Sequence, residues 1–190
     1  MKLVIMLSML AIVVCACVTT EIGPDGNPIT RDPPETELVI DEHSRIIAKP
    51  SRITPPDTII VNEGTPTERT IKLLGLEGVP KEDAPRTFET CAWWLKEFVA
   101  PAMTIYIRFP GGTDLDQNVI YGEVLLDAVD EETGRPIPDG YVSVNQAMLS
   151  WGLVRIANPE AIKDEDMLRR MRNAEAIAKR EKRGLWSNDP

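Results

Sequence analysis

Among the side chains of this sequence that are suited to acid–base chemistry, Glu123 is the least expected. The stretch 118–129 has the composition of a strand, yet this carboxylate follows directly after Tyr121 and Gly122. The single histidine, His43, lies in a polar, proline-rich segment, where we expect it to be solvated. A histidine-based triad and a histidine-rich metal site are therefore excluded. The question is whether Glu123 takes part in chemistry or prevents it.

Two of the three cysteines lie at the end of an apolar N-terminal run. The run extends from Leu3 to Val18 after one lysine. A membrane-spanning helix needs about 20 apolar residues, so this shorter run is more typical of a secretory signal segment. Ala16 directly precedes Cys17, and a small residue before a cysteine resembles the lipobox of bacterial lipoproteins, whereas Val14 precedes the other candidate, Cys15.

The lipobox resemblance implies that Cys17 becomes the lipidated first residue of the mature chain. Stable anchoring by acyl chains needs two or more of them, and a modified cysteine at the membrane edge can carry them. We therefore expect an exported protein of the bacterial cell envelope, held at the membrane by its lipid anchor. The alternative is an ordinary cleaved signal peptide with incidental cysteines.

The third cysteine, Cys91, has no partner left for an intramolecular disulfide once Cys15 is removed and Cys17 is acylated. Its neighbours Phe88, Ala92 and Leu95 are apolar at helical spacing. We expect a buried thiol that packs as a small hydrophobic side chain.

Composition predicts a folded domain but does not favour nucleic acid as its partner. Hydrophobic residues make up 43% of the chain and there are four tryptophans, which indicates a real core. The formal net charge is −9, so the overall electrostatics of the chain does not favour nucleic-acid binding. The C-terminal stretch 169–183 is locally basic, but Glu175 and Glu181 interrupt it in the way typical of an exposed amphipathic helix. Trp93 and Trp94 are predicted to be partly core rather than a base-stacking platform, with one of the two exposed.

The chain is predicted to have three parts. Residues 1–17 form the lipoprotein-type signal segment, and residues 18–45 form an extended or disordered tether, rich in proline, threonine and acidic residues. The folded domain covers residues 46–190, and residues 44–53, at the end of the proline-rich approach, are also suited to a first strand. Internal repeats, glycine-rich phosphate loops and Cys/His clusters are absent from the sequence, so zinc is not expected.

Within the domain, strand-type patterns alternate with three helices. Strands are predicted at 57–64, 69–78, 103–109 and 118–129, the last followed by a hairpin turn at 130–140. Helices are predicted at about 85–100 with Asp83 as N-cap, at 143–150 with Ser143 and Gln146 as a capping box, and at about 164–183 with Gly184 as the C-terminal cap. This order predicts an α+β fold, a small barrel with helical additions.

Four segments together resemble the thermonuclease, or staphylococcal-nuclease-like, domain. The resemblance covers about residues 46–188 and is carried by "DTIIV…RTIKLLGLEGVP", "YGEVLLDAV", "VNQAMLSWGLVRI" and "AEAIAKREKRGLWS". It implies a five-stranded OB-type barrel with three helices. Members of this family cleave phosphodiesters of DNA or RNA using Ca²⁺, or bind nucleic acid or protein after losing catalysis.

The resemblance also assigns a metal site and a general base. The two family aspartates correspond to Asp57 and Glu77, and oxygen ligands of this kind suit Ca²⁺. They also have a plainer interpretation, in which Asp57 is a turn residue and Glu77 a solvated strand end. The family's base follows a proline, but here Pro80 comes one residue late and Glu82 is the next carboxylate. Glu82 replaces the base only if the loop is rearranged, because displacements of an ångström are costly in catalysis.

The two arginine positions of the family hold Lys72 and Glu123 in this chain. Lysine keeps the charge but loses the two-pronged hydrogen bonding that fits phosphate. At Glu123 the sign is reversed: two unit charges about 5 Å apart interact by roughly 3 kcal/mol at an effective dielectric of about 20, so the reversal costs on the order of 6–7 kcal/mol before screening. That is roughly four to five powers of ten in rate.

These substitutions predict a catalytically degenerate, envelope-anchored domain that acts as a binding module for a protein, a surface polymer or another ligand. The alternative is a metal-dependent nuclease that hydrolyses extracellular DNA or RNA with Lys72 and a repositioned Glu82.

Overall fold

The computed structural model describes residues 21–22, 28–29, 38–110, 115–130, 133 and 135–187. The chain divides into two compact units, residues 1–33 and 34–190. In the first unit, β1 (Glu21–Ile22) and β2 (Pro28–Ile29) pair antiparallel. Cys17 and the rest of the predicted signal segment lie outside the described residues. None of the described helices is long and apolar enough to cross a membrane.

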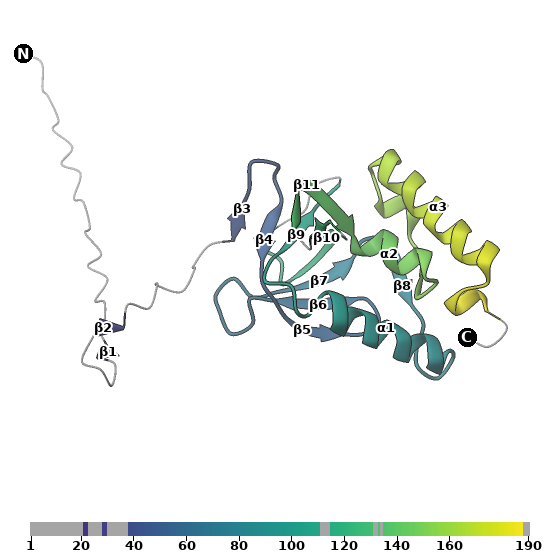
Figure 1. Cartoon of the computed structure of the whole chain (residues 1–190), viewed down its shortest axis with the longest axis horizontal. Helices are drawn as coiled ribbons and strands as arrows, with labels where there is room; N and C mark the ends of the chain where they lie inside the picture. Colours follow the sequence, from purple (N-terminus) through teal and green to yellow (C-terminus); the bar gives the residue numbers. More distant parts are fainter. Residues whose placement is uncertain are drawn as a thin grey trace, which may run out of the picture. The chain divides into compact units, whose positions relative to one another are not determined.

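The second unit is an α+β domain built on one large, mostly antiparallel sheet (Figure 1). The strand order is β3-β4-β9-β10-β7-β6-β5, β11 pairs with β10, and β8 and β12 form a separate two-stranded sheet. The strands of this unit are β3 (Val39–Ile40), β4 (Ile46–Ala48), β5 (Pro50–Thr54), β6 (Thr58–Val61), β7 (Arg69–Leu73), β8 (Leu76–Gly78), β9 (Ile105–Arg108), β10 (Val119–Val129), β11 (Pro136–Ser143) and β12 (Val154–Ile156).

The strands β4 and β5 follow one another with only Lys49 between them. β4 pairs with β9, near one end of the strand order, and β5 pairs with β6 at the other end. One continuous stretch of chain therefore pairs with strands near both ends of the strand order. The inward residues of these strands form the core together with the buried faces of the helices, and they are mostly β-branched, including Ile46, Ile59, Val61, Ile71, Ile105, Ile107, Ile120 and Val124.

The first helix, α1 (Pro85–Phe98), lies where the sequence pattern places it, but its start differs from the prediction. Its N-cap is Ala84, which makes no capping hydrogen bond, rather than Asp83. Pro85 sets the start because its fixed φ and missing N–H suit the first helical turn. The helix buries Cys91 and Trp94, while Trp93 stays exposed, so the prediction of a buried thiol is confirmed.

The other two helices are α2 (Val144–Ser150) and α3 (Glu165–Glu181), and β12 lies between them in the sequence. Ser143 caps α2 by accepting a hydrogen bond from the Gln146 N–H, as predicted, and Asp164 caps α3 through the Met167 N–H. The prediction of Gly184 as the cap of α3 is wrong, because Lys182 adopts the left-handed conformation that ends the helix. Gly184 instead allows the backbone to approach Gly152, where a Cβ would lie 2.3 Å from a carbonyl oxygen.

Two predicted strands also have different bounds in the structure. The stretch 69–78 is broken at Leu74 and Gly75 into β7 and β8, because Gly75 turns the chain with a positive φ. The sheet begins at Val39, since β3 pairs with β4, and it therefore extends into the range 18–45 predicted as tether.

Candidate functional site

Four residues at or near the positions assigned by the family resemblance line a single pocket of about 450 Å³, the Lys72 pocket. They are Asp57, Lys72, Glu77 and Tyr121. Sheet register explains the arrangement: Lys72 on β7 lies opposite Thr58, which follows Asp57, and opposite Tyr121 on β10. Glu77 joins them because β8 begins directly after the turn that ends β7.

Both carboxylates of the Lys72 pocket are engaged by neighbouring groups. Asp57 Oδ1 accepts a hydrogen bond of 2.8 Å from the Thr58 hydroxyl. Glu77 Oε2 accepts hydrogen bonds of 3.1 and 2.8 Å from Arg155, its direct cross-strand partner on β12. Arg155 thus offsets the charge of one of the two predicted metal ligands.

The donor set of the Lys72 pocket does not by itself fit a closed Ca²⁺ site. Ca²⁺ takes six to eight oxygen ligands, and the pocket supplies two carboxylates, one of them already bound to Arg155. The cationic residue Lys72 lines the same space. Within the part of the chain that the structure describes, no group of three or more His, Cys, Asp or Glu side chains is placed to hold a metal ion.

The predicted substitute base, Glu82, lies in the exposed turn before α1 and does not line the Lys72 pocket. The turn is fixed by hydrogen bonds from the Asp83 and Ala84 N–H groups to the Pro80 carbonyl. In this structure Glu82 is therefore not beside Asp57 and Lys72.

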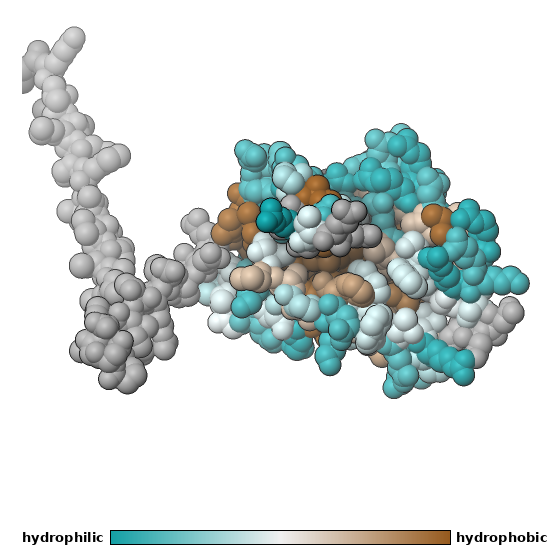
Figure 2. Space-filling model, viewed as in Figure 1, coloured by the Kyte–Doolittle hydropathy of each residue, from teal (hydrophilic) through white to brown (hydrophobic). Residues whose placement is uncertain are grey.

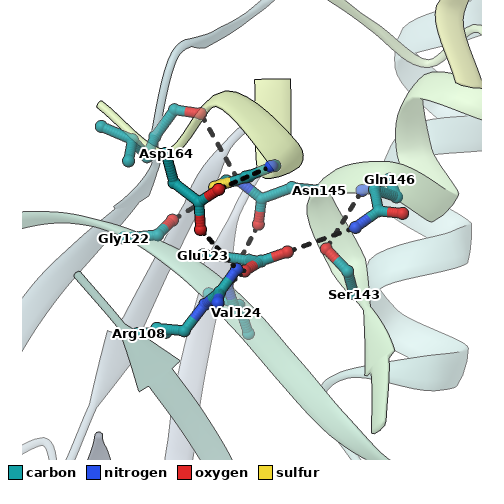
Figure 3. Close-up of polar contacts among 10 residues, drawn as sticks. Arg108, Gly122, Glu123, Val124, Ser143, Asn145, Gln146 and Asp164 are labelled. Carbon is teal, nitrogen blue, oxygen red and sulfur yellow. Dashed lines mark hydrogen bonds and ion pairs between the residues drawn. The ribbon is translucent and has the colours of Figure 1, made fainter. Parts of the chain in front are cut away.

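Glu123 lies in the interior and binds Arg108 (Figure 3). Its side chain is 2% exposed, and its Oε2 accepts hydrogen bonds of 2.9 and 2.6 Å from Nε and Nη2 of Arg108. The two residues are direct cross-strand partners on β10 and β9. The other carboxylate oxygen accepts a 3.3 Å hydrogen bond from the Gln146 amide. Glu123 is not among the residues that line the Lys72 pocket.

Asp164 extends this network to the start of α3. Its Oδ2 lies 3.6 Å from Nη2 of Arg108, and its Oδ1 accepts the Met167 N–H at 2.9 Å. The Met167 hydrogen bond and the positive charges of Arg108 and Arg170 hold the pKa of Asp164 below its ordinary value, although burial opposes them. One guanidinium thus joins β9, β10 and α3.

Asn145 is a second buried polar residue of this region, and sequence reasoning missed it. It is fully buried, its Oδ1 accepts the Val124 N–H at 3.0 Å, and its amide group faces the Leu74 and Gly122 carbonyls at 3.5 and 3.4 Å (Figure 3). Asn145 therefore fastens α2 to β10 on both sides of Glu123, and to Leu74 directly after β7. The signal in the sequence was an asparagine amid the apolar residues of a short helix.

The basic face of α3 is largely paired with its own acidic residues. Lys179 binds Glu175, Arg169 binds Asp166, and both Arg180 and Arg183 bind Glu181. The solvent side of this helix is mostly hydrophilic in Figure 2. The pattern agrees with a solvated amphipathic helix whose charges are locally balanced.

Comparison with models of known protein families found none that matches this chain, and no curated protein matches it either.

Proposed function

We propose that this chain is a non-catalytic binding module, built on a thermonuclease-like OB-type barrel and held at the bacterial cell envelope by a lipid anchor. Its ligand, a protein, a surface polymer or a smaller molecule, binds at the Lys72 pocket. The observation that carries the proposal is the burial of Glu123 against Arg108.

The continuity of β4 and β5 supports the barrel. A strand whose two halves pair with strands at opposite ends of a sheet brings those ends together, as a small barrel requires. The five strands in this scheme are the combined β4–β5 stretch and β6, β7, β9 and β10, with the three helices outside.

The charges around the Lys72 pocket support the loss of catalysis. Phosphodiester hydrolysis needs fixed cations where negative charge develops in the transition state. Lys72 is the one cationic side chain among the described residues that line this pocket. Glu123 does not supply a second, and its cross-strand partner Arg108 on β9 is used to neutralise Glu123. Arg155, which contacts this pocket's Glu77, is likewise paired with that carboxylate. Binding remains available, because the half-buried cleft offers one cation, two carboxylates and the exposed ring of Tyr121.

Loss of catalysis is tested by incubating the full chain, solubilised in a nonionic detergent, with single-stranded DNA and with RNA in the presence of Ca²⁺ or Mg²⁺. We expect no turnover above that of the Asp57→Ala variant. Metal-dependent cleavage that Asp57→Ala abolishes would refute the proposal.

A second candidate function, metal-dependent phosphodiester hydrolysis, is favoured by one observation. Asp57, Lys72 and Glu77 line a common pocket even though they come from three places in the chain, the turn before β6, β7 and β8. The same assay decides between the two functions, with Lys72→Met as a further variant that removes the cation. Cleavage lost in both Asp57→Ala and Lys72→Met would establish the nuclease.

The anchor is proposed from the sequence around Cys17, which lies outside the described residues. We expect Cys17→Ala to release the chain from the membrane fraction of cells that produce it, and Cys15→Ala, its neighbour two residues away, to leave it there. Membrane retention of Cys17→Ala equal to that of the parent chain would remove the lipid anchor from the proposal.

A further inference from the structure

A second concave surface, separate from the Lys72 pocket, lies beside the Glu123 network. It has a volume of about 550 Å³ and shares no lining residue with the Lys72 pocket. Three arginines that are far apart in sequence line it, together with a histidine and several hydrogen-bonding side chains. This Arg170 pocket is lined by His43, Arg45, Arg108, Glu123, Leu125, Tyr141, Ser143, Gln146 and Arg170.

We propose that the Arg170 pocket binds a small oxyanion, the phosphate or carboxylate group of a ligand of metabolite size. Guanidinium groups suit such groups because they donate paired hydrogen bonds in a fixed plane. Arg170, exposed on α3, makes no ion pair and no hydrogen bond within the ranges that the structure describes, although its charge contributes to the lowered pKa of Asp164. Its donors are therefore available to a ligand.

The other two arginines are held in place by carboxylates. Arg45 binds Asp41 Oδ2 at 2.6 Å and the Tyr141 hydroxyl at 3.1 Å, and its guanidinium lies 4.4 Å from the centre of the Tyr141 ring. Arg108 is fixed by Glu123 and Asp164, yet its side chain remains 36% exposed. The guanidinium of Arg45 is thus held in place where this residue lines the pocket, and Arg108 contributes a second cation whose position is fixed by its carboxylate partners.

Of the three carboxylates that hold these arginines, two do not line the pocket and the third is buried. Asp41 and Asp164 do not line it, and Glu123 is almost completely buried with both oxygens hydrogen-bonded. Asp41, Asp164 and Glu123 thus balance the three guanidiniums in formal charge, and a fourth carboxylate, the exposed Glu42, lies 3.7 Å from Nε2 of the pocket-lining His43. Hydrogen-bond donors still dominate the residues that line the pocket. We therefore expect the site to bind an oxyanion with modest affinity. The apolar side chain of Leu125 and the Tyr141 ring are left to contact the rest of the ligand.

The test titrates the full, ¹⁵N-labelled chain in nonionic detergent with inorganic phosphate and, separately, with citrate, at ionic strength matched by sodium chloride. We expect saturable shifts of the Gln146 side-chain amide and of backbone amides around Arg170. Saturation by phosphate at lower concentration would identify phosphorylated ligands, and saturation by citrate would identify carboxylates. Shifts that do not saturate, or that sodium chloride reproduces, would overturn the proposal.

Two variants on the same helix make the test specific. Arg170→Gln removes the arginine whose donors are available, and should weaken binding about tenfold, or about 1.4 kcal/mol. Arg172→Gln removes an equal charge from an exposed position outside the pocket, and should leave binding within about twofold of the parent chain. Equal affinity of Arg170→Gln and the parent chain would also overturn the proposal, since neither variant removes a buried contact.

Discussion

Arg108 and Glu123 are direct cross-strand partners whose closest contact, from Nη2 to Oε2, is 2.6 Å. The side chain of Glu123 is 2% exposed and that of Arg108 is 36% exposed. A second pair in the same domain, Arg155 and Glu77, has the same cross-strand relationship and a contact of 2.8 Å, but both side chains are 52% exposed. The domain therefore contains two ion pairs of like geometry that differ in their contact with water.

The two pairs should differ strongly in their contribution to stability. Breaking a buried pair leaves an uncompensated charge and costs about 3–5 kcal/mol, which partial exposure of Arg108 reduces to about 2–4 kcal/mol for Glu123→Gln. Exposed pairs contribute about 0–1 kcal/mol, so Glu77→Gln should change the free energy of unfolding by less than about 1 kcal/mol. Urea unfolding followed by circular dichroism measures both changes.

A double-mutant cycle isolates the pairwise energies. Arg108→Met and Glu123→Gln, combined, should reveal a coupling of about 1–3 kcal/mol, whereas Arg155→Met and Glu77→Gln should be additive within about 0.5 kcal/mol. Equal coupling energies in the two cycles would show that Glu123 is not stabilised as a buried ion, and would weaken the interpretation of Arg108 as its structural partner.

Asn145 should be as important to folding as the ion pair. Asn145→Ala leaves the Val124 N–H without its acceptor in the interior, which costs about 1–3 kcal/mol in addition to the loss of packing. Gln146→Ala removes only one long hydrogen bond to Glu123 from a half-buried position, and should cost less than about 1 kcal/mol. Chemical unfolding of the two variants provides the comparison, and a smaller effect for Asn145→Ala than for Gln146→Ala would contradict the role of Asn145 in fastening α2.

The elements themselves were largely predictable from local patterns, because helices and strands have their own periodicities. The cap Ser143 follows from its side-chain type at a helix start, whereas Asp83, predicted in the same way, is not the cap of α1. The grouping of Asp57, Lys72 and Glu77 was accessible only through the family resemblance, although adjacent strands then explain it.

The partner of Glu123 was not predictable in the same way. Arg108 meets Glu123 because of the register between β9 and β10, and a slip of one residue would place the arginine on the other face. The Arg170 pocket depends on five segments that meet only in the folded chain: residues 43–45, β9, β10, residues 141–146 and α3. Contacts between residues so far apart in the chain leave no recognisable pattern in a single sequence.

Asp164 should make the domain sensitive to acid in a narrow range of pH. Its folded pKa lies below the ordinary value, so it stabilises the folded state at pH values above the unfolded pKa of about 3.9, and this contribution is lost as the pH falls through the lower folded pKa. Asp164→Asn keeps a good cap and removes the charge, so it isolates the attraction of Arg108 and Arg170.

We expect Asp164→Asn to lower the free energy of unfolding by about 0.5–1 kcal/mol at pH 6, and the difference from the parent chain to shrink below about pH 4. Asp166→Asn, at an exposed position in the same helical turn, is the matched control and should have a smaller effect. A difference for Asp164→Asn that stays constant from pH 6 to strongly acidic conditions would contradict an electrostatic origin.

The thiol of Cys91 should be inert in the folded protein. Burial, with a smaller contribution from the negative charge of Asp57, raises its pKa to about 12. Its Sγ also donates a 3.2 Å hydrogen bond to the Pro56 carbonyl. Since the thiolate is the reactive form, a chain carrying Cys15→Ser and Cys17→Ser should not react with a disulfide reagent at pH 8 until urea unfolds it. Rapid labelling of the native chain at pH 8 would show that α1 opens far more readily than its buried face allows.

The raised pKa of Cys91 also predicts a dependence of stability on pH. Cys91 stabilises the fold below the ordinary thiol pKa and loses this contribution between about pH 9 and pH 12. Replacing Cys91 with alanine should therefore flatten the decline of stability in that range.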